Sequence, residues 1–454
     1  MKKLIALIPL AALGVAGYIQ HVSAQAPAAP QNLVITNARV IDGTGRVIER
    51  GSVVVRDGKI VSVAAGNASA DRAQVIDAKG MTVMPGFVDA HRHIIRGDGQ
   101  QWLKQDAAAQ MQQFLEAGFT TVVSAGDDQN AILELRRRSA SGELTAPRIF
   151  AAGRVALAGR AGGAAPARGD GPGRGDGARG AAPAAQARGG GFGGRGDPAR
   201  FDVSRPPLRP TQPAPGIPPA ETIAAVEAVA KAGFDYIKTA ITATPGGPET
   251  ATLTLVVQEG KKRNIPTITH AVTVIDTLAA VQAGPAVLVH TPHIGRLEED
   301  AKAVQTIARA GIPMTSTLAI FIPHFGEDNK PLFRDALDFP WDTISSAGQG
   351  PVNARLLWEA GISYGYGTDT SWPPRESFAD ELRALSLTFS PRDIVTILTK
   401  NAAASALKST ELGTLEPGKL ADIVILDGNP LQTTTALMNV RMVVKGGKVV
   451  VNKR

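Results

Sequence analysis

The chain has 454 residues, of which 44% are apolar and 20% charged, a composition typical of a globular protein with a large core. It has no cysteine, which excludes disulfides, thiolate metal ligands and a cysteine nucleophile. The net charge is +7, but the basic excess lies in the first residues and in one segment, 158–218, so no nucleic-acid partner is expected.

The first 24 residues have the pattern of a secretory signal peptide. Lys2 and Lys3 precede an apolar run from Leu4 to Tyr18, and the small-residue stretch "VSA" ends just before Gln25. An uncleaved anchor is the alternative, but the run is shorter than the ~20 residues that a membrane span needs. We therefore expect a periplasmic or secreted protein with no stable membrane insertion after the signal is removed.

Both ends of the mature chain have the pattern of antiparallel β structure. Within residues 25–84, the stretch 33–63 alternates apolar and polar residues, with a hairpin turn at Asp57–Gly58. Residues 411–454 contain the same kind of short β pattern, with Gly446–Gly447 as the turn. The two ends are therefore predicted to form one small β-sandwich domain, with residues 85–410 inserted into it.

Residues 85–410 alternate short apolar strands with helical patterns. Several of the helical patterns end in glycine, the usual residue just past a helix. Eight such units predict a TIM (β/α)8 barrel, an α/β fold. The eight predicted strands are "GFVDAHRH", "TTVVSAG", "RIFAAGR", "FDYIKTAIT", "PTITHAV", "AVLVHTP", "PMTSTLAI" and "ISYGYGTD".

A segment rich in glycine, alanine, arginine and proline, residues 158–218, interrupts the barrel after its third strand. It has nine arginines, four aspartates and few large apolar residues, so it is predicted to be disordered. The tripeptide "RGD" occurs there three times, but this composition produces it by chance, so a cell-adhesion role is disfavoured. A mobile lid and attraction to an anionic surface are the functional alternatives.

Metal-binding residue types fall at the ends of the predicted strands, where barrel active sites gather. His91 and His93 in "MPGFVDAHRHI" point the same way from one strand. Each such residue alone has an ordinary structural explanation, as a satisfied polar group or a turn residue. Together they indicate one site, made of His91 and His93, Lys238, His270, His290 and Asp369 at the ends of the first, fourth, fifth, sixth and eighth strands.

The motifs "PGFVDAHRH", "YIKTA", "THAV", "LVHT", "GTDT" and "GTLEPGKLADIVILDGNPL" resemble the amidohydrolase superfamily, in particular its imidazolonepropionase-like and Xaa-Pro-dipeptidase-like branch. The resemblance implies a CO2-derived carbamate on Lys238 that bridges two divalent metal ions. It implies that His91, His93, Lys238 and Asp369 hold one ion and that Lys238, His270 and His290 hold the other. Ligands without sulfur suit Zn²⁺, with Mn²⁺, Fe²⁺ or Co²⁺ as alternatives.

The implied mechanism is hydrolysis by a hydroxide that bridges metals about 3.5–4 Å apart. Asp369 would take the proton of this hydroxide and pass it to the departing amine. The predicted substrates are small amides, either N-acyl amino acids or dipeptides. The alternatives are a hydrolase of lactones, cyclic imidazolone-like amides or organophosphate esters and, disfavoured by the retained residues, an inactive binding module. A homo-oligomer is possible by analogy with relatives, but the sequence does not indicate an interface.

Four further residues are candidates for contact with the substrate. Arg154, just after the third strand, is the preferred partner of a substrate carboxylate, and Tyr236 shares a strand face with Lys238. His293 and His324 follow the sixth and seventh strands and could line the pocket or make loop hydrogen bonds. The second strand lacks the Arg–Asp pair of many relatives, which leaves its contribution to the pocket open.

Overall fold

The computed structural model describes residues 32–69, 72–159, 213–321 and 343–453. Two sheets organise this part of the chain, a parallel one in the middle and a mostly antiparallel one made by the two chain ends. The predicted signal peptide, His324 and nearly all of segment 158–218 lie outside the described residues. The described borders of that segment meet, because the amide of Gly159 donates to the carbonyl of Pro215 at 2.7 Å.

The central sheet contains eight strands, and every strand pair in it is parallel. Its strands are mostly buried, because helices cover one face and the barrel interior the other. In chain order the strands are β6 (Phe87–Arg92), β7 (Phe119–Ser124), β8 (Arg148–Arg154), β9 (Tyr236–Ala240), β10 (Thr267–His270), β11 (Val287–Val289), β12 (Met314–Thr315) and β13 (Tyr364–Gly365).

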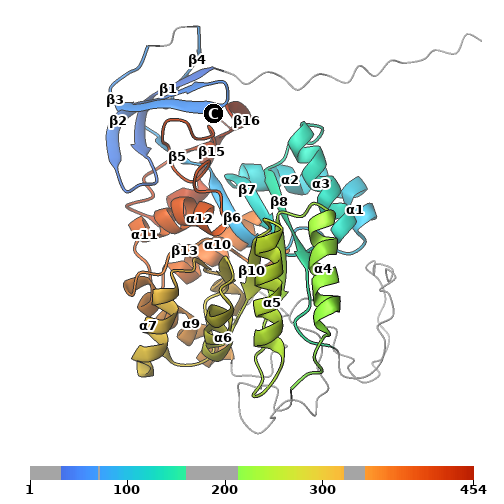
Figure 1. The fold of residues 1–454 in the computed structure, drawn as a ribbon. Coiled ribbons are helices and arrows are strands. Elements are labelled where there is room, and N and C mark those ends of the chain that lie inside the picture. Colours follow the sequence, from blue (N-terminus) through green and yellow to red (C-terminus); the bar gives the residue numbers. More distant parts are fainter. Residues whose placement is uncertain (1–31, 70–71, 160–212, 322–342, 454) are drawn as a thin grey trace, which may run out of the picture.

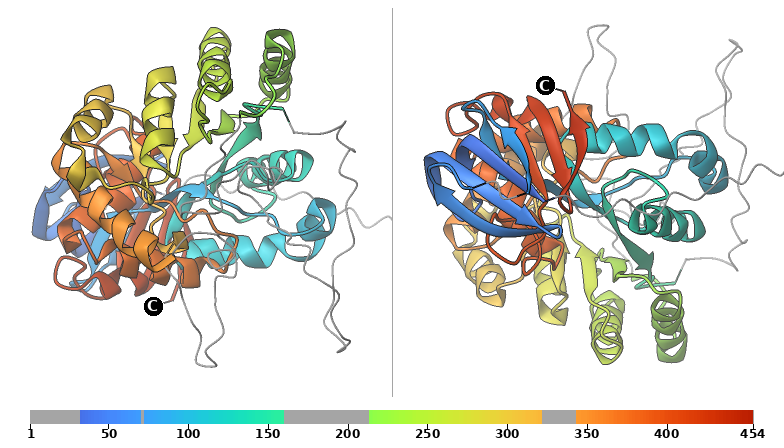
Figure 2. Two further views of the ribbon diagram at one scale, coloured as in Figure 1. Left: turned by 90° about the horizontal axis from the view of Figure 1, so that it is seen from below. Right: turned by 90° about the horizontal axis from the view of Figure 1, so that it is seen from above.

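Helices connect consecutive strands of this sheet and surround it (Figures 1 and 2). They are α1 (Gly99–Gln105), α2 (Ala107–Glu116), α3 (Gln129–Ser141), α4 (Pro219–Lys231), α5 (Glu249–Lys262), α6 (Val274–Ala283), α7 (Ala301–Ala310), α9 (Thr343–Glu359) and α10 (Pro374–Leu385). Side chains of Asp128, Thr273 and Asp300 cap the starts of α3, α6 and α7. Left-handed glycines follow the same three helices, as the sequence pattern predicts.

Main-chain hydrogen bonds join the first strand of the barrel to the last. The amide of Ala90 on β6 donates to the carbonyl of Tyr366, just past β13, at 2.9 Å. One step further along, the amides of Thr368 and Asp369 both donate to the carbonyl of His91, at 3.0 and 2.8 Å. These bonds close the sheet, and the prediction of a (β/α)8 barrel is confirmed.

The second sheet brings the two ends of the chain together. Its strand order is β16-β15-β14-β5-β1-β2-β3, with β4 paired to β1. Apolar side chains from both ends, among them Leu33, Ile35, Val53 and Ile425, form a core separate from that of the barrel. The strands are β1 (Leu33–Ile41), β2 (Val47–Arg56), β3 (Lys59–Ala65), β4 (Gln74–Asp77), β5 (Thr82–Pro85), β14 (Ile423–Leu426), β15 (Val440–Lys445) and β16 (Lys448–Asn452).

Polar contacts join the barrel to this smaller domain. Arg148, at the start of β8, forms an ion pair with Asp422 over 2.7 Å, and Lys445 donates to the carbonyl of Ala146 at 2.6 Å. Along the chain, α11 (Pro391–Thr396) and α12 (Ala402–Ser405) come between α10 and β14. Ser390 and Asp393 form a capping box at the start of α11.

No helix in the described part of the chain has the length and apolar character that crossing a bilayer requires.

Gly86 joins the two domains and provides a test of the packing between them. A β-carbon at this position would lie 2.4 Å from Oγ1 and 2.6 Å from Cγ2 of Thr120 on β7. Thr120 is fully buried, so Gly86→Ala is expected to cost about 1–3 kcal/mol through overpacking. Thermal unfolding followed by circular dichroism should show a lower midpoint.

The matched control is Gly348→Ala on α9, where an added β-carbon meets no atom within 4 Å. This variant should melt at the temperature of the wild type or slightly above, because alanine favours a helix over glycine. Equal midpoints for Gly86→Ala and the wild type would contradict the packing described.

Candidate metal centre

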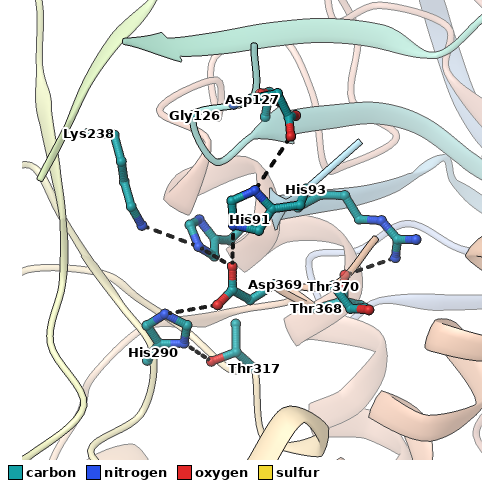
Figure 3. Close-up of polar contacts among 12 residues, drawn as sticks. His91, His93, Gly126, Asp127, Lys238, His290, Thr317, Thr368, Asp369 and Thr370 are labelled. Atoms are coloured by element: carbon teal, nitrogen blue, oxygen red, sulfur yellow. Dashed lines mark hydrogen bonds and ion pairs between the residues drawn. The ribbon is translucent and has the colours of Figure 1, made fainter. Parts of the chain in front are cut away.

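The six predicted residues lie at the carboxyl ends of the barrel strands, and Figure 3 shows His91, His93, Lys238, His290 and Asp369 gathered around one point. His91 belongs to β6, and His93 follows that strand by one residue. Lys238 lies within β9 and His270 ends β10. His290 directly follows β11, and Asp369 follows β13. The closed sheet therefore brings together side chains that are far apart in the sequence.

The carboxylate of Asp369 lies at the centre of this cluster. Its Oδ1 is 3.0 Å from Nε2 of His91 and 3.2 Å from Nε2 of His93. Its Oδ2 is 3.3 Å from Nε2 of His290. Ligand atoms of His91, His290 and Asp369 all lie within 4.8 Å of one another, and all three side chains are buried. Three imidazole nitrogens directed at one carboxylate form a group that could hold a divalent cation.

Lys238 and His270 complete the cluster on its other side. The Nζ of Lys238 is 3.3 Å from Nε2 of His91, and Figure 3 shows the side chain directed at that ring. The ring of His270 packs edge-on against the ring of His290, with centroids 4.3 Å apart. All six residues therefore share one space, although their roles as ligands remain a prediction.

Burial keeps three of the imidazoles neutral at neutral pH. Burial, assisted by the positive charge of Lys238, lowers the pKa of His91 to about 4 and that of His270 to about 3. Burial and the neighbouring His270 hold the pKa of His290 well below its usual value. Neutral imidazoles offer a lone pair to a cation, so these three rings are in the protonation state that metal binding needs.

His93 and Asp369 have the opposite tendency. Burial lowers the pKa of His93, but hydrogen bonds to Asp127 and Asp369 outweigh it and raise that pKa to about 9. Burial also disfavours the charged form of Asp369, yet His91 and His290 hold its pKa well below the usual range. Without a cation, the cluster therefore contains an ionised carboxylate beside a protonated His93.

Burial also lowers the pKa of Lys238 to about 7, against the attraction of Asp369 and with the help of the positive Arg154. The amine is consequently neutral in a large fraction of molecules at neutral pH. A neutral amine is a nucleophile, whereas an ammonium group is not.

Left-handed backbone occurs at the ends of three consecutive strands. His290 has a φ of 78°, Thr317 of 44° and Asp369 of 51°. Non-glycine residues avoid this region, and each costs of order 1–3 kcal/mol. Such strain persists where the surrounding contacts hold it. Here His290 and Asp369 face each other inside the cluster, and the Thr317 hydroxyl faces the other nitrogen of the His290 ring.

Asp127, which follows β7, was not among the residues predicted from the sequence. Its Oδ1 is 3.5 Å from Nδ1 of His93, and its Oδ2 accepts hydrogen bonds from the Ser124 hydroxyl and the Ile94 amide. An acidic residue just past the second strand was the available signal. Asp127 is thus a residue by which the second strand contributes to the cluster, although the chain lacks the Arg–Asp pair of many relatives at this strand.

A buried polar network adjoins the cluster, and its residues were not predicted from the sequence. Arg92 donates to the hydroxyl of Thr368 at 3.0 Å and also contacts the carbonyl of Trp372. The Thr368 hydroxyl donates to Asp89 at 2.9 Å, and the other Asp89 oxygen accepts the amide of His91. The network therefore ties β6 to the segment that carries Asp369.

The four residues predicted to contact the substrate lie in different surroundings. Arg154 pairs in register with Lys238 on the neighbouring strand, and its exposed side chain donates through Nε to the carbonyl of Gly126 at 2.6 Å. His293 is buried against α9, where a β-carbon on Gly350 would lie 2.3 Å from its Nδ1. His324 lies outside the described residues, so its role stays a prediction.

Tyr236 has a main-chain partner away from the cluster, so its contact with a substrate stays a prediction that the structure does not favour. Its side chain is buried, and its hydroxyl donates to the carbonyl of Ala406, beyond α12, at 2.6 Å. Tyr236 does share the inward face of β9 with Lys238, but it lies two residues nearer the amino end of the strand. It therefore fills the barrel interior below the cluster.

Comparisons with known proteins agree with this architecture. Residues 82–450 match the model of the amidohydrolase family. An imidazolonepropionase from Shouchella clausii is 27% identical over 203 residues, 43% of this chain and 40% of that protein. A dihydroorotase from Anaeromyxobacter dehalogenans is 36% identical over 121 residues, 27% of each chain. The chain thus matches less than half the length of these two curated relatives.

Solved structures resemble the whole fold. A putative prolidase from Bifidobacterium longum has a TM-score of 0.70 at 22% identity, covering 94% of this chain and 97% of its own. A Xaa-Pro dipeptidase with bound methionine has a TM-score of 0.69 at 21% identity, covering 92% and 99%. With the family match over most of its length, its closed parallel barrel and the His/Lys/Asp cluster at the strand ends, the chain belongs to the amidohydrolase family.

Proposed function

We propose that this protein is a metal-dependent hydrolase that cleaves the carbon–nitrogen bond of small amides, either N-acyl amino acids or dipeptides. The observation that carries the proposal is the buried carboxylate of Asp369, which faces the Nε2 atoms of three histidines at 3.0–3.3 Å. Membership of the amidohydrolase family and the names of its curated relatives support hydrolysis at a carbon–nitrogen bond.

The donor set fits a pair of divalent cations. It consists of four imidazoles, one carboxylate and one amine, with no sulfur, which suits Zn²⁺ first and Mn²⁺, Fe²⁺ or Co²⁺ as alternatives. His91, His93 and Asp369 would hold one ion, His270 and His290 the other, and Lys238 would lie between them. When bound, such a pair polarises the scissile carbonyl and activates water.

An unmodified Lys238 fits this role poorly, because its ammonium form repels cations. We infer that Lys238 carries a carbamate, formed when the neutral amine attacks CO2 and releases one proton. The product is an anion with two oxygens, which would suit a residue between two cations. Burial favours this reaction because it lowers the pKa of Lys238 to about 7.

Asp369 is the group that moves the proton in this proposal. Its carboxylate is ionised, because His91 and His290 hold its pKa well below the usual range. It can therefore accept a proton from the attacking water and deliver it to the departing nitrogen, which is a poor leaving group without that proton.

Arg154 would bind the substrate carboxylate. Its Nε is occupied by the carbonyl of Gly126, which anchors the guanidinium at the end of β8. Its register partner is Lys238, so the two side chains leave the sheet at the same level. A guanidinium held in this way can bind a carboxylate through its terminal nitrogens.

Cyclic amides are the second candidate substrates. The curated relatives that carry the names imidazolonepropionase, dihydroorotase and allantoinase favour this class. The same cluster could serve either reaction, because the loops above a barrel select the substrate.

A substrate panel tests the proposed reaction. The full chain, loaded with Zn²⁺ or Mn²⁺, should hydrolyse members of a set of N-acetyl amino acids and dipeptides. Asp369→Asn should lower kcat by about 100-fold or more, because proton transfer is lost. The panel also contains cyclic amides, lactones and organophosphate triesters. Activity confined to the lactones and triesters would contradict the proposal, whereas activity confined to cyclic amides would select the second candidate.

Bicarbonate dependence of metal binding tests the carbamate. In CO2-depleted buffer, added bicarbonate should increase the metal content of the metal-free chain at pH 8. The increase should shrink at pH 6, because Lys238, with a pKa of about 7, is protonated there and cannot attack CO2. Elemental analysis after desalting measures the metal.

Two lysine variants are the controls for this test. Lys238→Ala should show no response to bicarbonate. Lys445→Ala removes another largely buried lysine, at the contact with Ala146, and should respond like the wild type. A wild-type metal content that is independent of bicarbonate at pH 8 would exclude the carbamate.

The role of Arg154 predicts a change in substrate preference. Arg154→Met should lower kcat/KM for an N-acetyl amino acid by about 10- to 100-fold, because the variant loses a hydrogen bond to a charged group. The loss should appear mainly as a higher KM. The corresponding N-acetyl amino acid amide, which lacks the carboxylate, is the matched control and should be hydrolysed equally by the variant and the wild type. Equal losses for both substrates would assign Arg154 a structural role.

A further inference from the structure

Thr317, just past β12, contacts the ring nitrogen of His290 that faces away from Asp369. Its Oγ1 is 2.7 Å from His290 Nδ1, and Figure 3 shows the hydroxyl beside the ring. Both residues are almost completely buried. We propose that Thr317 is a positioning residue, whose hydroxyl oxygen accepts the Nδ1 proton of His290 and so reserves the Nε2 lone pair for a divalent cation. This inference rests on the metal centre of the proposed function.

The two nitrogens of His290 have separate partners. Nε2 faces Oδ2 of Asp369 at 3.3 Å, inside the cluster, whereas Nδ1 faces Thr317 outside it. An imidazole that binds a cation through Nε2 must carry its proton on Nδ1, and a partner for that proton selects this tautomer. In a buried site, an N–H group without an acceptor costs about 1–3 kcal/mol. The Thr317 hydroxyl removes this cost.

The backbone of Thr317 supports a specific role for its side chain. A φ of 44° is strained for a β-branched residue, and glycine would adopt it freely. The strain is held by the Thr317 amide, which donates to the carbonyl of Gly367 at 3.1 Å. Glu381 on α10 holds the next turn, since its carboxylate accepts the amides of Leu318 and Ala319 at 3.0 and 2.8 Å. A strained threonine, fixed by its own amide and by the turn that follows it, places its hydroxyl at His290.

Neighbouring threonines act on the main chain and not on the ring. The Oγ1 of Thr315 accepts the amide of His290 at 3.1 Å, and the hydroxyl of Thr291 donates to the carbonyl of Ser316 at 3.0 Å. Thr291 is as buried as Thr317. It therefore offers a matched control for the loss of a buried hydroxyl next to the cluster.

The test measures metal affinity in the full-length chain. Thr317→Val keeps the shape of the side chain and removes the acceptor. Competition with a chromophoric chelator should show that one of two Zn²⁺ ions binds about 10- to 100-fold more weakly than in the wild type. Thr317→Ser, which keeps the hydroxyl, should restore most of the affinity. Thr291→Val should bind both ions like the wild type.

Two further measurements separate positioning from stability. Thr317→Gly relieves the strained φ, so its metal-free form should melt no lower than that of Thr317→Val, while its metal affinity should remain reduced. With ¹⁵N-labelled histidine, NMR of the Zn²⁺-loaded protein should assign the His290 proton to Nδ1 in the wild type. If Thr317→Val does not fold, Thr317→Gly takes its place in the affinity measurement.

The outcomes distinguish this inference from the proposed function. If the wild type binds two ions and both hydroxyl-deficient Thr317 variants bind them with unchanged affinity, the positioning role is wrong while the proposed function stands. Equal weakening in Thr291→Val would also overturn it, because any buried hydroxyl would then have the same effect. If the wild type binds no transition metal, the proposed function fails, and the inference fails with it.

Discussion

Closure of the parallel sheet is the constraint on which the cluster depends. The first and last strands meet through main-chain hydrogen bonds, and two of these bonds end on the carbonyl of His91 itself. One of the two donors is the amide of Asp369, so the bonds that close the barrel also set the distance between two candidate ligands. A shift of one residue in this pairing would turn one of the two side chains out of the cluster.

Polar groups around the candidate ligands depend on this closure. Arg92, Asp89 and Thr368 tie β6 to the segment that carries Asp369. Asp127 contacts His93, and Thr317 contacts His290. Buried polar groups are costly unless each has a partner, so a connected network of this kind favours one arrangement of the side chains. For a hydrolase, such an arrangement means that the groups are oriented before the substrate binds.

Local patterns predicted the barrel well because they are physical properties of single elements. Short apolar runs separated by helices that end in glycine indicated eight strands, and the structure has all eight within a few residues of the predicted positions. Tyr236 shows what such patterns do not predict. Strand alternation correctly assigned it to the inward face, but alternation carries no information on depth, and the ring lies below the cluster with its hydroxyl on Ala406.

The sequence by itself therefore determined the order of strands and helices and the residue types at each strand end, because both follow from nearest-neighbour chemistry along the chain. Only the tertiary structure decided which of those residues touch, that Asp127 faces His93, and that a strained Thr317 faces His290. Contacts between strands depend on register, closure and side-chain rotamers. These are properties of elements packed against one another, and no single segment of the sequence contains them.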